Sequence, residues 1–279
     1  MVALRSGRRV TGCPSVPETA RRIDRLDTAA RFTAAQAEAL NARFAGVGTH
    51  EMLEAVLKDG LAGRIAAVSS FGAESAVLLH LLARIDKAVP VLFLDTGKHF
   101  PETLAYRDEL VARIGLTNLI NLTPEQEDIA KRDENGLRWS YDPDGCCEIR
   151  KVAPLAKALT GFDASFTGRK GFQSATRAGL ARFELDTTDA AGRLKVNPLA
   201  DWSSDQIESY FTATGLPPHP LVTQGYPSIG CSPCTSKVAP GEDPRAGRWR
   251  GWDKTECGIH VDGAAEGVTD LPPGYDPAF

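Results

Sequence analysis

Short apolar runs alternate with longer amphipathic segments through the middle of the chain. Four runs have the length and flanking turn residues of buried strands: 65–68, 89–94, 118–122 and 164–167. Helical spacing follows the first two, from about Ser75 and from Pro101, and a polar helix is expected over 126–133. A further segment begins at Val196, and Ser203 is expected to cap a helix that runs to about Thr214. The alternation predicts an α/β fold in which a twisted parallel sheet is flanked by helices.

The two ends of the chain have a different texture. Residues 1–20 mix Arg, Gly, Pro and Ser without a period and are expected to be a flexible leader, after which packing helices follow to about Lys58. Beyond Val238, Gly and Pro recur too often for regular structure. We therefore expect an α/β domain over 21–240 and a mobile tail over 241–279 that closes over a site or swings away.

Composition and charge restrict the class of protein. The chain has 279 residues, 42% of them hydrophobic, which suits one large globular domain. A net charge of −4 argues against nonspecific binding of nucleic acid. No apolar run approaches the roughly 20 residues of a membrane span. The N-terminal arginines lack the apolar core of a secretory signal, which leaves a basic tail or an organelle transit segment.

The first strand runs into a loop rich in small and hydroxyl-bearing residues. Ser69, Ser70 and Ser75 offer hydroxyls, and Gly72 permits close approach of a ligand to the backbone. The helix that follows would direct unpaired N–H groups at an anion. The loop therefore predicts a phosphate site, with an ordinary strand-to-helix turn as the alternative.

A second loop, 95–97, follows the next strand. Because parallel strands end at one edge of a sheet, both loops are expected to lie beside one nucleotide.

Six cysteines are present, and four of them form two close pairs: Cys146–Cys147 and Cys231-Ser-Pro-Cys234. Four thiolates complete either a [4Fe–4S] cluster or a tetrahedral zinc site. Adjacent cysteines need a constrained turn, for which Gly145 is well placed, and the cluster offers more widely separated positions than one zinc ion. The remaining alternative is a dithiol with two unrelated buried cysteines.

Cys257 stands apart from these pairs, between Lys254 and His260. Positive charge nearby favours the thiolate that a nucleophile requires, although a tail cysteine can also be incidental. Arg245 and Arg248 carry planar forks suited to phosphate or sulfate, or simply belong to a solvated tail. Further cations follow the cysteine pair and the fourth strand: Arg150, Lys151, Arg169, Lys170 and Arg177.

Five motifs, taken in order, resemble the assimilatory sulfonucleotide reductases over about residues 60–260: Ser-Ser-Phe-Gly-Ala-Glu at 69–74, Leu-Asp-Thr-Gly at 94–97, Cys-Cys-Glu-Ile-Arg-Lys at 146–151, Gly-Cys-Ser-Pro-Cys-Thr at 230–235 and Glu-Cys-Gly-Ile-His at 256–260. The resemblance implies the adenine nucleotide alpha hydrolase-like fold shared with ATP pyrophosphatases.

The resemblance also implies a reaction. Cys257 would attack the sulfur of adenylyl sulfate, releasing AMP and leaving an S-sulfocysteine, from which thioredoxin or glutaredoxin releases sulfite for cysteine biosynthesis. Cations would offset the repulsion between thiolate and substrate. Reduced thiols and an iron–sulfur cluster suit the cytoplasm, and a homo-oligomer is compatible with the sequence.

Residue by residue, the resemblance implies that the two cysteine pairs hold a [4Fe–4S] cluster and that the substrate is bound by Ser69, Ser70, Phe71, Gly72, Glu74, Leu94, Asp95, Thr96, Lys151, Gly168, Arg177, Arg245, Arg248 and His260. The segment 168–174 matches the family only loosely, and no role follows for Cys13 or for the extension after His260.

Three alternatives stay open. The four cluster cysteines favour adenylyl sulfate, but a phosphoadenylyl-sulfate or dual-substrate enzyme remains the nearest rival. An ATP pyrophosphatase would have Ser-Gly-Gly in the first loop and no need of Cys257. Outside enzymes, the chain fits a zinc-stabilised nucleotide-binding module.

Overall fold

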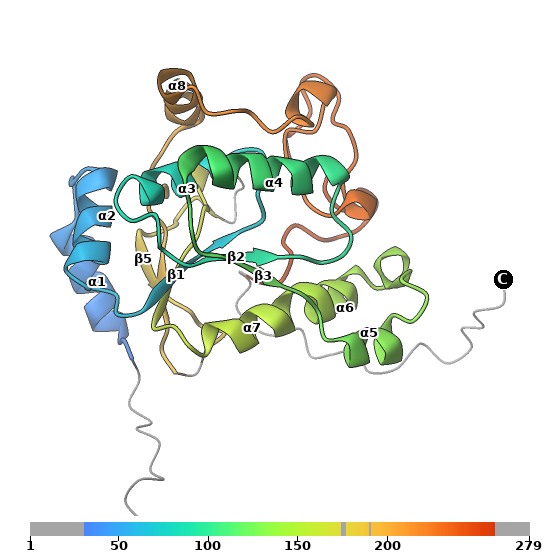
Figure 1. Cartoon of the computed structure of the whole chain (residues 1–279), viewed down its shortest axis with the longest axis horizontal. Coiled ribbons are helices and arrows are strands. Elements are labelled where there is room, and N and C mark those ends of the chain that lie inside the picture. Colours follow the sequence, from blue (N-terminus) through green and yellow to red (C-terminus); the bar gives the residue numbers. More distant parts are fainter. Residues whose placement is uncertain (1–30, 174–176, 190, 260–279) are drawn as a thin grey trace, which may run out of the picture.

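A single mixed sheet forms the centre of the molecule. The computed structural model describes residues 31–173, 177–189 and 191–259 (Figure 1). In this part of the chain the sheet has the order β3–β2–β1–β4–β6–β5. The strands are β1 (Ile65–Ser69), β2 (Val91–Leu94), β3 (Leu119–Leu122), β4 (Ala164–Phe166), β5 (Phe183–Leu185) and β6 (Leu194–Val196). All neighbours pair in parallel except β5, which runs antiparallel to β6 at one edge.

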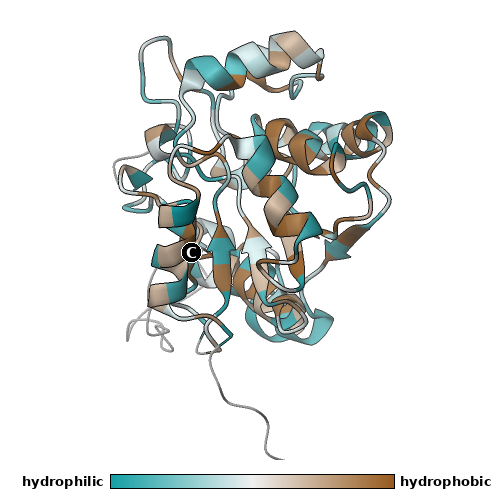
Figure 2. Ribbon diagram, turned by 90° about the vertical axis from the view of Figure 1, so that its left-hand side faces the viewer, coloured by the Kyte–Doolittle hydropathy of each residue, from teal (hydrophilic) through white to brown (hydrophobic). Residues whose placement is uncertain are grey.

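Helices cover both faces of this sheet. They are α1 (Ala34–Arg43), α2 (Thr49–Lys58), α3 (Ser75–Ala83), α4 (Pro101–Ile114), α5 (Gln126–Arg132), α6 (Pro143–Cys147), α7 (Ala153–Leu159) and α8 (Ser204–Thr214). In Figure 1, α3 and α4 lie on one face, and α6 and α7 on the other. Figure 2 shows hydrophilic and hydrophobic residues along the same helices, as expected for helices that cover a sheet with one side.

The strands alternate their side chains between two apolar clusters. Val91 and Phe93 of β2 belong to the larger cluster, with α3 and α4, whereas Leu92 and Leu94 belong to the smaller one, with Leu155 of α7. This period of two is the geometry of extended backbone, and burial of both faces explains why the parallel strands read as continuous apolar runs. The expected α/β architecture is confirmed.

The direction in which successive strands are added to the sheet reverses beside β1, which makes this position a topological switch point. The chain passes from β1 outward to β2 and β3, then returns to add β4 on the other side of β1. Crevices for ligands open at such points, beyond the carboxyl ends of the strands. The loops after β1 and β4 therefore lie side by side at this point.

Several boundaries differ from the sequence expectations. The segment expected to begin at Val196 is a strand that ends there, because Pro198 has no N–H with which to continue a ladder. Strand β5 was not expected at all. The predicted cap of α8 is confirmed, since Ser203 and Gln206 form a reciprocal capping box.

Within the described ranges, none of the helices combines the length and the apolar character needed to span a bilayer. The leader expected over residues 1–20 and the part of the tail beyond residue 259 lie outside these ranges, as does Cys13.

Candidate active site

The first loop makes a tight turn between β1 and α3. Phe71 is fully buried with φ 48°, a backbone region that bulky residues rarely adopt. Its amide donates to the Ser69 hydroxyl at 3.2 Å, and the Ser75 hydroxyl donates to the carbonyl of Gly72 at 2.8 Å. A Cβ on Gly72 would lie 3.2 Å from the carbonyl oxygen of Ile229, so this glycine permits a close backbone approach. The loop has the predicted strand–turn–helix form, and phosphate binding by it stays a prediction.

Glu74 ties this loop to the loop after β4. Its Oε2 lies 2.8 Å from Nζ of Lys170 and accepts a bond of 2.8 Å from the amide of Gln173. Only 2% of the Lys170 side chain is exposed, and burial lowers its pKa against the opposing effect of Glu74. Lys170 also donates to the carbonyl of Gly168 at 3.0 Å. The sequence marked Lys170 only as one of several cations after the fourth strand and gave Gln173 no role, because both lie in the segment that matches the family only loosely.

The loop after β2 contacts the second cysteine pair. The Thr96 hydroxyl lies 3.3 Å from Sγ of Cys231, and the amide of Ser232 donates to the carbonyl of Lys98 at 2.8 Å. Thr96 therefore lies at the thiols, and its contact with the nucleotide stays a prediction. Leu94 lies buried at the end of β2, and the Asp95 carboxylate accepts from the amide of Gly97 at 3.1 Å.

The first cysteine pair ends helix α6 and leads into a π-helical turn, η3 (Glu148–Val152). Cys146 and Cys147 are both buried. The constrained turn expected at this pair is thus the junction at which α6 passes into the wider π-helical turn η3. Such turns often mark functional sites. A Cβ on Gly145 would lie 2.2 Å from Oδ2 of Asp142 and 2.3 Å from Nη2 of Arg138, so a larger residue there would displace this ion pair.

Arg150 of the π-helical turn η3 makes structural contacts. It forms a buried ion pair of 2.6 Å with Asp133 and donates to the carbonyl of Thr96 at 2.8 Å. Because its charge is matched by a carboxylate, Arg150 is not an available cation for a ligand. Asp133 carried no signal in the sequence.

The four paired thiols influence one another's protonation. Burial raises the pKa of Cys146 to about 12, with Cys147 and Cys231 adding to the shift, and burial raises that of Cys147 to about 11. Cys231 is also buried, but Lys151, Thr96 and Arg248 outweigh that effect and lower its pKa. Cys234, on the short helix η7 (Ser232–Cys234), has its pKa raised by burial and by Cys231. The two pairs therefore form one thiol site.

Lys151 lies at the centre of this thiol site. Burial acts to lower its pKa, but the thiols of Cys231, Cys147 and Cys257 outweigh burial and raise it. In the described part of the chain no carboxylate pairs with it. The structure therefore brings the candidate nucleophile, the paired thiols and an ammonium group together.

The segment with Cys257 is packed against the domain. Glu256 pairs with Arg177 at 2.7 Å and with Arg245 at 3.5 Å, and Lys254 pairs with Asp144 on α6. Ile259 packs on the smaller apolar cluster. As far as residue 259, these contacts hold the Cys257 segment against the domain. The ability of the tail to swing away stays a prediction. His260 lies outside the described residues.

Arg248 differs from the other tail cations. Its backbone bridges to Thr235, beside the second cysteine pair, and its guanidinium lies 4.4 Å over the ring of Trp249. Its Nε has no hydrogen-bond partner, and none of the described carboxylates pairs with it. Among the expected anion-binding cations, Lys151 and Arg248 thus have no carboxylate partner within the described residues, whereas Arg177 and Arg245 share Glu256.

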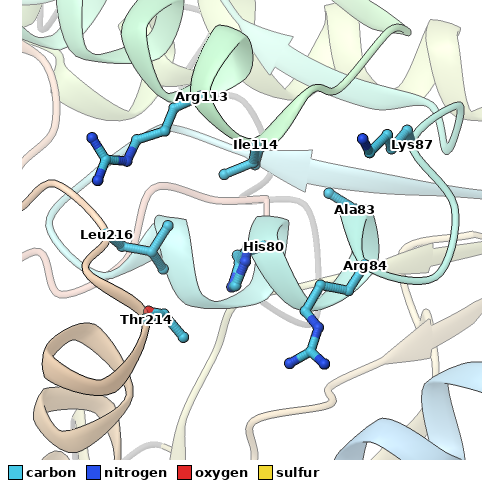
Figure 3. A pocket seen from close by; sticks show the side chains of 8 residues that line it. All are labelled: His80, Ala83, Arg84, Lys87, Arg113, Ile114, Thr214 and Leu216. Carbon is cyan, nitrogen blue, oxygen red and sulfur yellow. The ribbon is translucent and has the colours of Figure 1, made fainter.

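A pocket of about 330 Å³ lies elsewhere, where α3, α4 and α8 end (Figure 3). Arg84, Lys87 and Arg113 line it, and Arg113 donates to the carbonyl of Gly215 at 2.7 Å. Cations at helix carboxyl termini offset the negative end of the dipole, which explains this cluster without a ligand. Each of these helices follows a parallel strand and runs back along it, so the helices end near the amino ends of the strands. The pocket therefore lies at the opposite end of the strands from the thiol site.

Comparisons with known proteins agree with this geometry. Residues 64–237 match the phosphoadenosine phosphosulfate reductase domain family. A protein of Mesorhizobium japonicum named adenosine 5′-phosphosulfate reductase is 48% identical over 90% of this chain and 97% of its own length. One of the same name from Chelativorans is 49% identical over 80% of this chain and 90% of its own. Among solved structures, phosphoadenylyl-sulfate reductase from Candida auris, in complex with phosphate, matches with TM-score 0.61 and 27% identity over 74% of this chain and 98% of its own.

Proposed function

The chain belongs to the phosphoadenosine phosphosulfate reductase domain family, and on that premise we propose that it is an oxidoreductase that reduces adenylyl sulfate to sulfite and AMP in sulfate assimilation. The observation that carries the proposal is the position of Cys257. The next residue, Gly258, lies against Val152 of the π-helical turn η3, where a Cβ would be 3.4 Å from Cγ2 of Val152, and the Cys257 thiol helps to raise the pKa of Lys151 in that turn. A nucleophile, an uncompensated cation and the thiol site thus meet beyond the carboxyl ends of the strands.

In the first step the Cys257 thiolate attacks the substrate sulfur. The new S–S bond forms as the S–O bond to phosphate breaks, and AMP leaves with the electron pair of that bond. The product on the enzyme is an S-sulfocysteine. Lys151 and Arg248 would hold the anionic groups and reduce their repulsion of the thiolate. Because neither cation is neutralised by a described carboxylate, both are available for that task.

In the second step a thiolate of reduced thioredoxin or glutaredoxin attacks Sγ of Cys257. The S–S bond of the adduct breaks, sulfite leaves with its electron pair, and a mixed disulfide remains. The second thiol of the partner resolves it, which restores the Cys257 thiol and oxidises the partner by two electrons. The reaction therefore needs no other electron donor.

The thiol site fits a [4Fe–4S] cluster held by Cys146, Cys147, Cys231 and Cys234. Its donor set is four thiols from two segments, with the Thr96 hydroxyl and the Lys151 ammonium directed at Cys231. When bound, the cluster would supply a local electrostatic and structural role rather than electrons.

One other candidate follows from a specific observation. The structural match is to a phosphoadenylyl-sulfate reductase, which keeps the 3′-phosphorylated substrate as the second choice. The metal content of the purified protein distinguishes the zinc-stabilised module of the sequence analysis from this proposal. An ATP pyrophosphatase leaves the placement of Cys257 unexplained.

The deciding experiment is sulfite release by anaerobically purified protein with reduced thioredoxin and each sulfonucleotide in parallel. Much faster sulfite from adenylyl sulfate supports the proposal. Equal or reversed rates favour the dual or phosphoadenylyl class. No sulfite from either, with the thiol site metal-loaded, overturns the reductase proposal.

We further propose the division into an α/β domain over 21–240 and a mobile tail over 241–279. Mobility of the tail would let a thioredoxin-like partner reach the adduct on Cys257 after AMP has left.

A further inference from the structure

The segment that carries Cys257 is attached to the domain by two charged contacts. Lys254 pairs with Asp144 on α6, and only 5% of the Lys254 side chain is exposed. Two residues later, Glu256 accepts from Arg177 through both carboxylate oxygens, with Nε–Oε1 at 2.9 Å and Nη2–Oε2 at 2.8 Å. Cys257 follows directly. The nucleophile is therefore adjacent to a two-point ion pair, and its backbone cannot shift without disturbing that pair.

Arg177 is connected on its other side to the first loop. Its Nη1 donates to Oε1 of Gln173 at 2.5 Å, and Nε2 of Gln173 donates to Oε2 of Glu74 at 2.8 Å. Glu74 is in turn paired with the buried Lys170. Polar contacts thus run without a break from the loop before α3 to the residue before Cys257.

The central pair has the features of a strong contact. The side chains of Arg177 and Glu256 are 11% and 14% exposed, so salt screens them less than a surface pair. Two parallel N–H···O bonds fix both the distance and the orientation of the carboxylate. Arg245 adds a second guanidinium at 3.5 Å and donates to the carbonyl of Thr255 at 2.6 Å.

We propose that the Arg177–Glu256 ion pair is a latch that positions Cys257, and that Gln173 and Glu74 couple this latch to the first loop. What Cys257 does when positioned rests on the proposed function, but the latch itself is a statement about the free protein. Glu256 acts through its neighbour and is a positioning residue. Arg177 holds the tail in this scheme, so Lys151 and Arg248 remain to bind the anionic groups of the substrate.

Limited digestion with trypsin tests the latch in the metal-loaded full chain without any substrate. The peptide bond after Lys254 is protected from trypsin while the Lys254 side chain is paired with Asp144. The Arg250 side chain is 47% exposed, so cleavage after Arg250 supplies an internal reference. Arg177→Lys keeps the charge but loses the two-point geometry, and Glu256→Gln removes the charge. Each is expected to raise cleavage after Lys254 about tenfold relative to cleavage after Arg250. The double variant is expected to exceed neither single variant, because both remove one interaction.

Arg182→Lys is the matched control, since Arg182 pairs with Asp201 at 2.7 Å and is 16% exposed. It is expected to leave the cleavage ratio unchanged. Because Glu256→Gln lies close to the cleaved bond, its rate is divided by the rate in the urea-unfolded chain. Unchanged ratios in both latch variants overturn the latch, and an unchanged ratio in Gln173→Leu overturns its coupling to the first loop.

Single-turnover formation of the Cys257 adduct from adenylyl sulfate separates positioning from binding. Glu256→Gln is expected to slow adduct formation about a hundredfold while AMP affinity stays within about twofold. Glu256→Asp is expected to recover part of the rate. If Arg177→Lys binds AMP more weakly while its cleavage ratio is unchanged, Arg177 contacts the ligand and the latch is overturned. If wild type forms no adduct, the proposed function fails, whereas the digestion result still decides the latch.

Discussion

A cation attracts an incoming anion only to the extent that no carboxylate already neutralises it. This rule separates residues that are alike in sequence. Arg177 and Arg245 share Glu256, and Arg150 is matched by Asp133, whereas Arg248 has no such partner among the described residues. At the scale of single residues, the positive potential at the proposed site therefore comes from Arg248 together with Lys151.

Gly230→Ala is expected to displace the unpaired Arg248. A Cβ at residue 230 would lie 2.2 Å from Nη2 of Arg248, and the flexible guanidinium can yield where backbone could not. Turnover is expected to fall about tenfold, since one charge contact to the reacting group is worth a few kcal/mol at most, while stability changes by about 1 kcal/mol or less. Steady-state sulfite release and urea unfolding measure the two effects. Gly161→Ala is the control, because its nearest contact is an ordinary 3.8 Å, and equal activity losses in both variants would contradict the argument.

Cys257→Ser is expected to reduce sulfite formation about a thousandfold or more, because a hydroxyl at neutral pH cannot replace a thiolate nucleophile. Binding of AMP and metal content should be preserved, since the paired cysteines are untouched. Mass spectrometry after incubation with substrate alone should find a sulfonate adduct on wild type and none on the variant. A variant that retains full turnover would rule out the proposed chemistry. Cys13→Ser serves as the matched thiol control.

Residue types and spacing could predict which side chains gather, but not which of them neutralise each other. The motifs placed Cys257 with the paired cysteines, and the structure brings these thiols together. The pairing of Arg177 with Glu256 spans 79 positions, and that of Glu74 with Lys170 spans 96. Such contacts depend on the packing of loops from different strands, which no local pattern records.

At the scale of elements, the loop between α8 and η6 (Val222–Gln224) depends on an uncharged histidine. His219 is fully buried beside Tyr106, its Nδ1 accepts from the amide of Leu221 at 3.2 Å, and its Nε2 lies 3.1 Å from the Thr103 hydroxyl. Burial lowers its pKa from 6.5 to about 4. Protonation of Nδ1 would also remove the acceptor that Leu221 uses.

The sign of the pH effect follows from this lowered value. Between pH 6.5 and 4 the unfolded chain binds a proton at His219 that the folded chain does not, so stability falls as pH falls through this window. The contribution is about 3 kcal/mol, fully present above pH 6.5. In His219→Asn, urea midpoints should be lower at pH 7 but should fall less steeply toward pH 4 than in wild type. Parallel curves for the two proteins would contradict this account.

Elements with strong local signals were predictable, and those defined by long-range pairing were not. Strands β1, β2 and β4 are short runs of mostly buried residues, β3 is a half-exposed but largely apolar run at the edge, and α8 begins at a capping box that the sequence displays. Strand β5 has three residues, including Glu184, and forms only because β6 offers an edge. The π-turn after Cys147 likewise has no sequence signature, since its residues would also suit a regular helix.

At the scale of the whole molecule, the thiol site and the apolar core are separate. The larger apolar cluster joins the sheet to α2, α3 and α4, and neither cluster contains a cysteine. The paired cysteines lie instead on short segments beyond the strands, joined to the domain through Thr96 and Arg150. We therefore expect the sheet to fold without a metal at the thiol site, in contrast to small domains whose only core is a metal site.

Metal removal tests this separation directly. After anaerobic chelation, visible absorbance and sulfite release should be lost together, while far-ultraviolet circular dichroism and a cooperative urea transition should remain. Cys234→Ser, which removes a half-buried thiol, should give the same result without chelator. Metal analysis of the untreated protein should find iron and sulfide rather than zinc if Cys146, Cys147, Cys231 and Cys234 hold the proposed cluster. Loss of the circular dichroism signal on chelation would show that the thiol site carries the fold, since the buried apolar surface of the sheet and its helices would then be insufficient by itself.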